Sequence, residues 1–185
     1  MNKPTCDQDI RDKLLEDLRS DINNLKVIDE LDINNARADI ATVDNKYFSG
    51  YEIKSDRDSL KRLPMQIQIY DYVFDKIIIV VDESKLRKVS KIIPTFWGII
   101  AATRDVFGKI ILTDVRVPRL NRKINKRWLS KKLWRSDIVR ILKTKNLYKG
   151  RSGCYKGELL GILLENTSLH ELKYYIRAVL INRVY

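Results

Sequence analysis

Hydrophobic and polar residues alternate along the first third of the chain in patterns typical of one helix and three strands. Residues 5–20 carry a hydrophobic side chain every four positions, which predicts an amphipathic helix. Residues 26–33 predict a short strand. Residues 37–43 and 47–54 have the pattern of two strands, and the loop at 44–46 contains an asparagine that tolerates the left-handed backbone of a tight turn. A β-hairpin is therefore expected here.

The middle of the chain continues with helical and strand patterns in turn. Residues 55–74 have a helical pattern, in which Pro64 is expected to start a new turn or to kink the helix. The hydrophobic run at residues 76–82 is continuous, which is typical of a strand buried on both faces. A further helix is expected to end at Pro94, and two strands joined around Gly108 follow it. The order α-β-β-β-α-β-α-β-β predicts an α/β fold around a mixed sheet.

Beyond Val117 the pattern becomes helical throughout. Three helices are predicted, at residues 128–143, 154–165 and 169–182. We therefore divide the chain into an α/β core at residues 1–117 and a basic helical region at residues 118–185.

Positive charge is concentrated in that helical region. The whole chain has a formal net charge of +12, and residues 116–151 hold fourteen Lys or Arg against one acid, Asp137, a net +13. The other 149 residues therefore sum to −1. So uneven a block, interleaved with aromatic residues, predicts contacts to nucleic-acid phosphates rather than an ordinary solvated surface or a basic helix on a membrane. The expected contact residues are Arg122, Lys123, Lys126, Arg127, Lys131, Lys132, Arg135 and Lys156.

Several classes of protein are excluded by what the sequence lacks. No window of 18 apolar residues is present, and the first residues are rich in acids, so we predict a cytoplasmic protein without a membrane partner. Cys6 and Cys154 lie far apart, and His170 is the one histidine, which excludes a zinc finger and makes a disulfide framework or a histidine-dependent hydrolase improbable. The sequence contains no glycine-rich phosphate loop.

One strand of the expected hairpin carries charged residues in an apolar setting. Glu52 and Lys54 share a strand face because side chains alternate. A turn at Asn45–Lys46 makes paired residues sum to 91, which places Asp39 opposite Glu52. Two such carboxylates repel each other unless a cation lies near them, and their oxygen atoms suit Mg²⁺ or Mn²⁺. The alternative is a hairpin whose charged residues merely face solvent.

These residues resemble the motif of the PD-(D/E)XK nuclease superfamily, whose core is α-β-β-β-α-β with Asp on one strand and Glu-x-Lys on the next. Here RADIA supplies Asp39, preceded by Ala38 where many members have proline, and YEIK supplies Glu52 and Lys54. The Gln66…Tyr70 spacing resembles the Gln-x-x-x-Tyr motif of the RecB-like branch. The order IDEL, RADIA, YEIKSD and RLPMQ also resembles a small group of bacterial and phage nuclease-like proteins, over roughly residues 8 to 103.

The resemblance implies a restriction-endonuclease-like core and a metal-dependent nuclease that hydrolyses DNA phosphodiester bonds. It implies that Asp39 and Glu52 bind Mg²⁺, that Lys54 stabilises charge, and that Gln66 and Tyr70 support the site. Relatives often add one more acid, for which we favour Glu30 over Glu16.

Other charged residues near the motif receive local roles in this interpretation. Arg11 is interpreted as a surface charge of the first helix, although it could bind phosphate. Ser55, Asp56 and Asp58 are expected to cap the following helix.

Two alternatives to a DNA nuclease stay open at this point. One is a protein on a nuclease fold that binds or masks nucleic acid without cutting, since fold does not determine chemistry. The other is an RNA nuclease.

The segment ILKTKNLYKGRSGCYKGELLGILLE is similar to the helix-turn-helix of SAP DNA-binding modules, although a plain helical cap would look alike. The expected partner is DNA, with RNA and a homodimer left open.

Overall fold

The computed structural model describes residues 5–20 and 25–184 and has an α/β fold. The elements occur in the predicted order, followed by four further helices. In chain order they are α1 (Asp7–Ser20), β1 (Lys26–Ile33), β2 (Ala36–Val43), β3 (Phe48–Lys54), α2 (Leu63–Asp71), β4 (Lys76–Asp82), α3 (Glu83–Ile92), β5 (Gly98–Arg104), β6 (Ile110–Arg116), α4 (Lys126–Ser130), α5 (Arg135–Thr144), α6 (Lys156–Glu165) and α7 (Leu169–Asn182).

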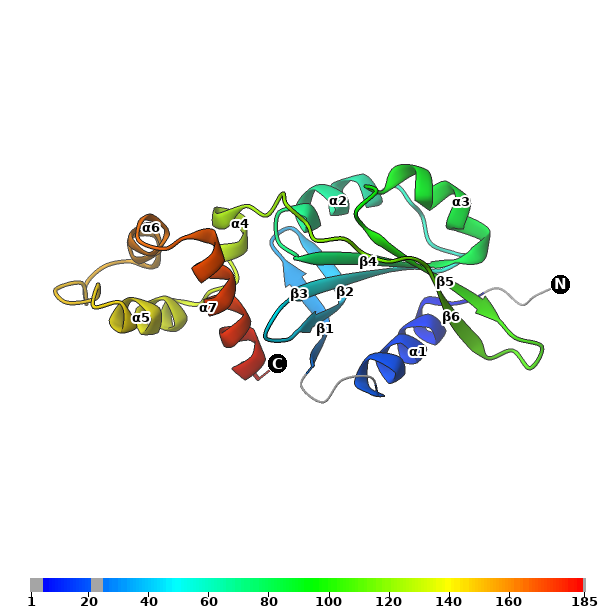
Figure 1. Cartoon of the computed structure of the whole chain (residues 1–185), viewed down its shortest axis with the longest axis horizontal. Helices are drawn as coiled ribbons and strands as arrows, with labels where there is room; N and C mark the ends of the chain where they lie inside the picture. Colours follow the sequence, from blue (N-terminus) through cyan, green and yellow to red (C-terminus); the bar gives the residue numbers. More distant parts are fainter. Residues whose placement is uncertain (1–4, 21–24, 185) are drawn as a thin grey trace.

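The six strands form one mixed sheet in the order β1-β2-β3-β4-β5-β6. β1, β2 and β3 are antiparallel, β3, β4 and β5 are parallel, and β6 returns antiparallel to β5. Helices α2 and α3 cover one face of the sheet, and α1 covers the other (Figure 1). The continuous hydrophobic run of β4 is explained by this arrangement, because the strand is central and both of its faces are covered.

Hydrophobic side chains form two cores, one on each face of the sheet. The smaller core lies under α1 and joins Ile10 and Leu14 to Ile53 and Val80 of the central strands. The larger core lies on the face of α2 and α3 and extends into the C-terminal helices. Because neighbouring residues of β3 face opposite sides, Ile53 enters the smaller core while Glu52 and Lys54 face the side of α2.

The predicted helix over residues 55–74 is correct only in its second half. Helix α2 begins at Leu63, with Pro64 in its first turn. Proline fits that position because it lacks only an N–H that has no partner in the first turn of a helix. Upstream, Asp58 accepts hydrogen bonds from the Ser55 backbone N–H and hydroxyl, which stabilises a turn. Ser55 and Asp58 therefore do not cap α2.

The single helix predicted at residues 128–143 is two helices. Asn125 caps α4 by accepting from the N–H groups of Arg127 and Trp128. A second start follows at α5, where the Asp137 carboxylate accepts from the Trp134 N–H at 2.9 Å. The hydrophobic periodicity is continuous across both helices and so predicted one helix. The two capping residues, about a dozen positions apart, mark two separate helix starts.

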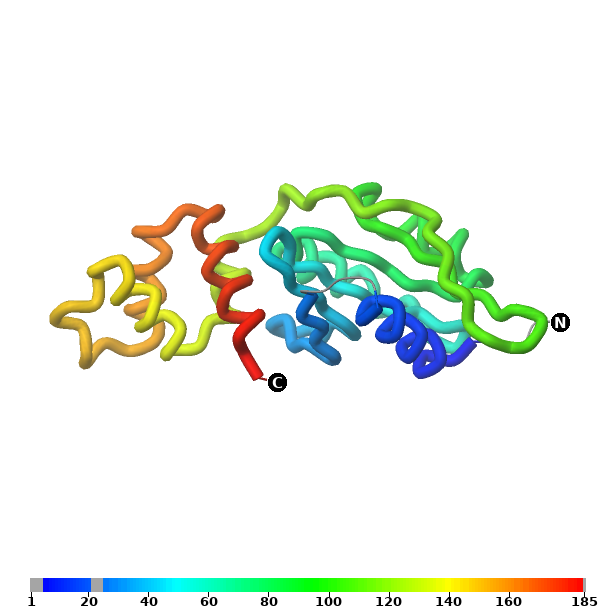
Figure 2. The backbone as a smooth tube through the Cα atoms, turned by 60° about the horizontal axis from the view of Figure 1, so that its bottom comes forward, coloured from blue at the N-terminus to red at the C-terminus, as the bar shows by residue number. Residues whose placement is uncertain are grey.

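Helices α4–α7 pack together at one end of the sheet (Figures 1 and 2). The junction contains ion pairs and hydrogen bonds as well as hydrophobic contacts. Lys173 of α7 lies 2.8 Å from the buried Asp75 carboxylate, which also accepts from the Phe48 N–H. Lys132 donates to the carbonyl of Asp32 in β1. The last strand ends at Arg116, and the division into two domains and the SAP-like character of α5–α6 stay predictions.

Within residues 5–20 and 25–184, none of the helices combines the length and the hydrophobicity needed to cross a membrane.

Candidate functional site

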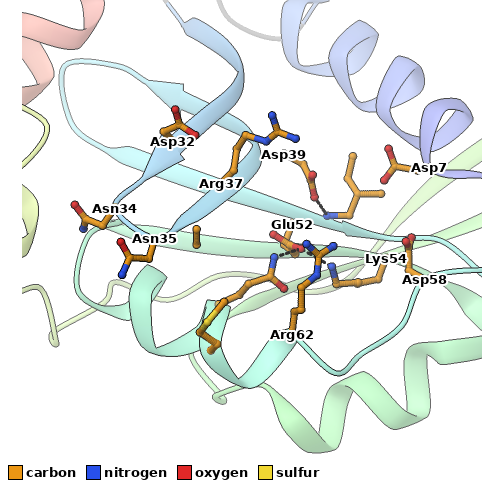
Figure 3. A pocket seen from close by; sticks show the side chains of 14 residues that line it. Asp7, Asp32, Asn34, Asn35, Arg37, Asp39, Glu52, Lys54, Asp58 and Arg62 are labelled. Carbon is orange, nitrogen blue, oxygen red and sulfur yellow. Dashed lines mark hydrogen bonds and ion pairs between the residues drawn. The ribbon is translucent and has the colours of Figure 1, made fainter.

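A polar cleft of about 520 Å³ opens beside the β1–β2 hairpin, the end of β3 and the start of α2 (Figure 3). Four of the residues predicted to form a site line it: Asp39, Glu52, Lys54 and Gln66. Arg37 and Arg62 add two cationic side chains, and Asp7 of α1 lies at its edge. The sequence motif and the polar cleft therefore coincide.

The hairpin register that places Asp39 opposite Glu52 is confirmed. Every pair between β2 and β3 sums to 91, as in Ile40 with Tyr51 and Val43 with Phe48. The Asp39 carboxylate accepts a hydrogen bond from the Ile53 N–H at 2.7 Å, which fixes it against β3.

Glu52 is buried, and three side chains donate to its carboxylate. The Lys54 ammonium and the Gln66 amide both reach Oε1 at 2.5 Å. The Tyr70 hydroxyl donates to Oε2 at 2.7 Å. Burial and the adjacent Glu52 charge raise the pKa of Tyr70, so its phenol keeps the proton that it donates. Gln66 and Tyr70 meet at Glu52 because they lie one helical turn apart on α2.

Asp39 is held by a different cation, Arg11 of α1. The Arg11 guanidinium donates to Asp39 Oδ1 at 3.0 Å, to the Asp39 carbonyl at 2.9 Å and to the Asp29 carboxylate at 2.7 Å. Burial raises the pKa of Asp39 to about 6, and the Glu52 charge acts in the same direction. The Ile53 N–H, Arg11 and Lys54 partly oppose this rise.

Arg11 is the residue of this site that the sequence interpretation placed wrongly. It is only 8 % exposed rather than a surface charge. A signal was present in the sequence, because positions 7, 11, 14 and 18 form one stripe of the helix, and Leu14 and Leu18 pack in the core under α1. A charged residue on the apolar stripe of a helix needs buried partners, and Asp39 is one of them.

Each of the two acids is paired with a cation of the chain itself. Glu52 is bound by Lys54, and Asp39 is bound by Arg11. Within the part of the chain that the structure describes, no three Asp, Glu, His or Cys residues lie together in a way that could hold a metal ion. These residues as arranged do not fit a Mg²⁺ site, which needs several free oxygen ligands in octahedral geometry. Mg²⁺ or Mn²⁺ at this pair therefore stays a prediction from the sequence.

Glu30, expected as a third acid, does not join this group. Its backbone is left-handed, with φ of 51°, and its exposed carboxylate pairs with Arg37 at 3.0 Å. Glu30 therefore does not line the cleft that Asp39 lines.

The basic residues expected to bind nucleic acid differ in their surroundings. Four are engaged within the protein: Lys123 pairs with Asp71, Lys126 donates to the Leu164 carbonyl, Lys132 donates to the Asp32 carbonyl, and Arg135 donates to the carbonyls of Ser152 and Cys154. Six of the expected contact residues are exposed: Arg122, Lys123, Arg127, Lys131, Arg135 and Lys156.

Asp39 should make stability depend on pH in an unusual direction. Its folded pKa of about 6 exceeds the ordinary value of 3.8, so the folded state binds the proton more tightly than the unfolded state. The stabilisation that protonation provides is complete below pH 4 and is lost as pH rises through 6, a change of about 3 kcal/mol. Urea unfolding at pH 4 to 7 should show the wild type losing stability by this amount relative to Asp39→Asn. A constant difference between the two proteins would contradict this prediction.

Comparisons with known proteins give a consistent family. The family model of bacteriophage P4 protein cII matches residues 2–185. The protein cII of Enterobacteria phage P4 is 32% identical over 123 residues, which cover 63% of this chain and 46% of that protein. The chain thus spans about half the length of this curated relative. A solved structure from Silicibacter pomeroyi, SPO1766, described as a protein of unknown function, aligns with a TM-score of 0.42 and 16% identity, over 75% of this chain and 89% of that one.

The family match overturns the prediction of a metal-dependent nuclease. The matching family and the curated relative are both protein cII of phage P4, and neither match is to a nuclease. The assignments to nucleases, hydrolases and endonucleases, for DNA or for RNA, are therefore wrong. Asp39, Glu52, Lys54, Gln66 and Tyr70 form a connected polar site, but they receive no catalytic role. The expectation of a phage origin agrees with the match. The chain belongs to the bacteriophage P4 protein cII family.

Proposed function

We propose that this chain binds nucleic acid without cutting it. The observation that carries the proposal is the charge of the helical region, where residues 116–151 hold a net +13. Exposed cations occur from the approach to α4 as far as the start of α6, for example Arg122, Arg127 and Lys156. A protein that neutralises several phosphates gains affinity for any nucleic acid by releasing the counter-ions around it.

We further propose that the α/β core is a restriction-endonuclease-like fold that has a binding role. The order α1-β1-β2-β3-α2-β4, with Asp39 and Glu52 on adjacent strands, supports this relationship. The two acids are bound by Arg11 and Lys54, an arrangement suited to a structural role. A fold can be kept while its chemistry changes, so the motif residues are compatible with binding alone.

DNA is the partner we propose, and RNA is the alternative. Phosphate contacts serve both polymers, so binding has to be compared on matched DNA and RNA to distinguish the two. A homodimer and a cytoplasmic location stay predictions from the sequence.

The experiment measures binding of the full chain to labelled duplex DNA by fluorescence anisotropy at several salt concentrations. Removing two exposed cations, Arg122→Ala with Arg127→Ala, should weaken binding roughly 10-fold and make the slope of log K against log salt shallower by about 2. The matched control, Lys88→Ala with Lys91→Ala, removes the same amount of charge from α3, which belongs to the α/β core and not to the basic helical region. It should change the slope of log K against log salt much less.

Three results would decide against the proposal. The first is the lack of binding to both duplex and single-stranded DNA at about 50 mM salt, a concentration at which phosphate contacts are strong. The second is an equal loss in both double variants, and the third is cleavage of the labelled DNA. A duplex RNA of the same sequence, tested in parallel, separates the DNA and RNA alternatives.

A further inference from the structure

Two large aromatic side chains of the helical region are exposed among cations. Trp134 is 57% exposed, and Tyr155 is 81% exposed. Trp134 directly precedes α5, and Tyr155 directly precedes α6. Large aromatic side chains are usually buried, because each contributes 150 to 250 Å² of surface, so a pair of exposed ones on a charged surface suggests an interaction site.

The chain holds the beginnings of α5 and α6 next to each other. The Arg135 guanidinium donates to the carbonyl oxygens of Ser152 and Cys154, at 3.3 Å and 3.2 Å. Arg135 follows Trp134 and Cys154 precedes Tyr155, so this bridge brings the segments of the two aromatic residues together. Lys156 is also near enough to lower the pKa of Lys132.

Trp134 is already stacked on one side. The Arg183 guanidinium carbon lies 3.9 Å from the centre of the indole ring, and the same guanidinium is fixed by the Asp137 carboxylate at 2.6 Å. Arg183 thus contacts one face of the Trp134 ring and holds the ring in one orientation, and the rest of the side chain stays open to solvent.

The surroundings of the two rings carry mostly positive charge. The nearby cations are Lys132, Arg135, Lys156 and Arg183. Burial and the neighbouring charges of Arg183 and Lys156 lower the pKa of Lys132 to about 8, while Asp32 opposes the change. Acids also lie near this surface: Asp32 beside Lys132, Asp137, which Arg183 and Arg140 bind, and Glu158, which accepts from the Tyr155 N–H. An anionic partner with flat apolar groups complements such a surface.

We propose that Trp134 and Tyr155 form an aromatic platform on which the unpaired bases of a single-stranded nucleic acid stack, while the cations around them bind its phosphates. This inference rests on the proposed nucleic-acid binding and names its substrate class. Bases in a duplex are stacked on each other and leave no free face, whereas unpaired bases stack on aromatic side chains in most single-strand-binding proteins. The platform is separate from the polar cleft, since neither aromatic residue lines it.

The test compares binding of the full chain to a labelled oligo-dT and to a duplex of the same length, at one salt concentration. Tyr155→Ala should weaken binding to oligo-dT about 10-fold and binding to the duplex less than about 2-fold. Tyr155→Phe keeps the ring and should bind oligo-dT like the wild type. The matched control is Tyr174→Ala, which removes a tyrosine that is 59% exposed on α7 and should leave oligo-dT binding unchanged.

A second measurement follows Trp134 itself. Stacking of a base on the indole should quench tryptophan fluorescence when oligo-dT is added, and Trp134→Phe should remove most of that quenching while keeping a ring under Arg183. Oligo-rU in a parallel titration distinguishes RNA from DNA as the source of the bases.

The outcomes separate this inference from the proposed function. If the chain binds duplex and single strand through charge and Tyr155→Ala alters neither, the aromatic platform is refuted while nucleic-acid binding stands. The same conclusion follows if Tyr155→Ala weakens both substrates equally. If neither substrate binds to the wild type, the proposed function fails and the platform fails with it.

Discussion

Replacing Arg11 by leucine should destabilise the protein by about 3 kcal/mol or more at pH 7, a large fraction of the 5 to 15 kcal/mol that stabilises an ordinary domain. Arg11 donates to the carboxylates of Asp7, Asp29 and Asp39 and to the Asp39 carbonyl, at the edge of the cleft. Removing it leaves the partly buried Asp39 carboxylate without its cation, and breaking one side of such a pair costs more than the pair contributes.

Equilibrium unfolding in urea measures this loss, and two further variants interpret it. Arg11→Lys should recover only part of the stability, because an ammonium cannot reach all four acceptor groups with the fixed geometry of a guanidinium. Lys13→Met removes a partly exposed cation from the same helix, where it pairs with Glu16 and Asp17, and should leave the unfolding midpoint almost unchanged. A loss for Arg11→Leu no larger than that of Lys13→Met would show that Arg11 is not a structural counter-ion.

The sheet could be predicted closely from the sequence because its signals are local. Strands β1 and β4 begin and end where the hydrophobic runs do, at Lys26–Ile33 and Lys76–Asp82. The hairpin register followed from the position of one turn, and it placed Asp39 and Glu52 in the correct relationship. Side-chain alternation and turn position are properties of a few neighbouring residues, so no tertiary information was needed.

The helix errors arose where two local signals competed. The helix was expected to begin at residue 55, with Pro64 starting a new turn or kinking it. The structure has Pro64 in the first turn of α2, where a proline is acceptable, and the preceding turn is held by Asp58. Asn125 and Asp137 each start a helix, and the hydrophobic pattern across them concealed the break. Capping bonds decide such boundaries, and their partners are settled only in the folded chain.

The functional error has a different physical origin. Four of the motif residues, Asp39, Glu52, Lys54 and Gln66, line the cleft, but the function depends on what neutralises the two acids. Arg11 is 28 positions from Asp39, and no local pattern connects the two. A carboxylate pair beside a lysine has the same sequence whether a metal ion or the protein's own cations balance its charge. The residue types and the strand register therefore predicted which side chains lie near one another. The family match was needed to correct the nuclease assignment, and the contacts of α1 were needed to show that Arg11 binds Asp39.

The Lys54–Glu52 pair should behave as a single unit in which each residue is costly to remove alone. Both side chains are buried, and their charged atoms lie 2.5 Å apart. Lys54→Met leaves Glu52 with only neutral donors, and Glu52→Gln leaves a buried ammonium without its carboxylate. Each change should cost about 3 to 5 kcal/mol, since an uncompensated charge remains in a poorly solvated place.

The double variant Lys54→Met/Glu52→Gln should be more stable than the sum of the single losses predicts, by roughly 1.5 to 3 kcal/mol, because it removes both charges together. Urea unfolding of the four proteins gives this coupling directly. Lys123→Met provides the control, since its cation pairs with Asp71 from an exposed position and should cost less than about 1 kcal/mol. Additive losses in the cycle would show that the two charges are stabilised by something other than each other.

Repeating the cycle in millimolar Mn²⁺ tests the metal prediction. An ion bound between Asp39 and Glu52 should stabilise the wild type against urea, and Glu52→Gln should lose that effect. If the Lys54 ammonium neutralises Glu52 instead, the stability of the wild type should not respond to the ion.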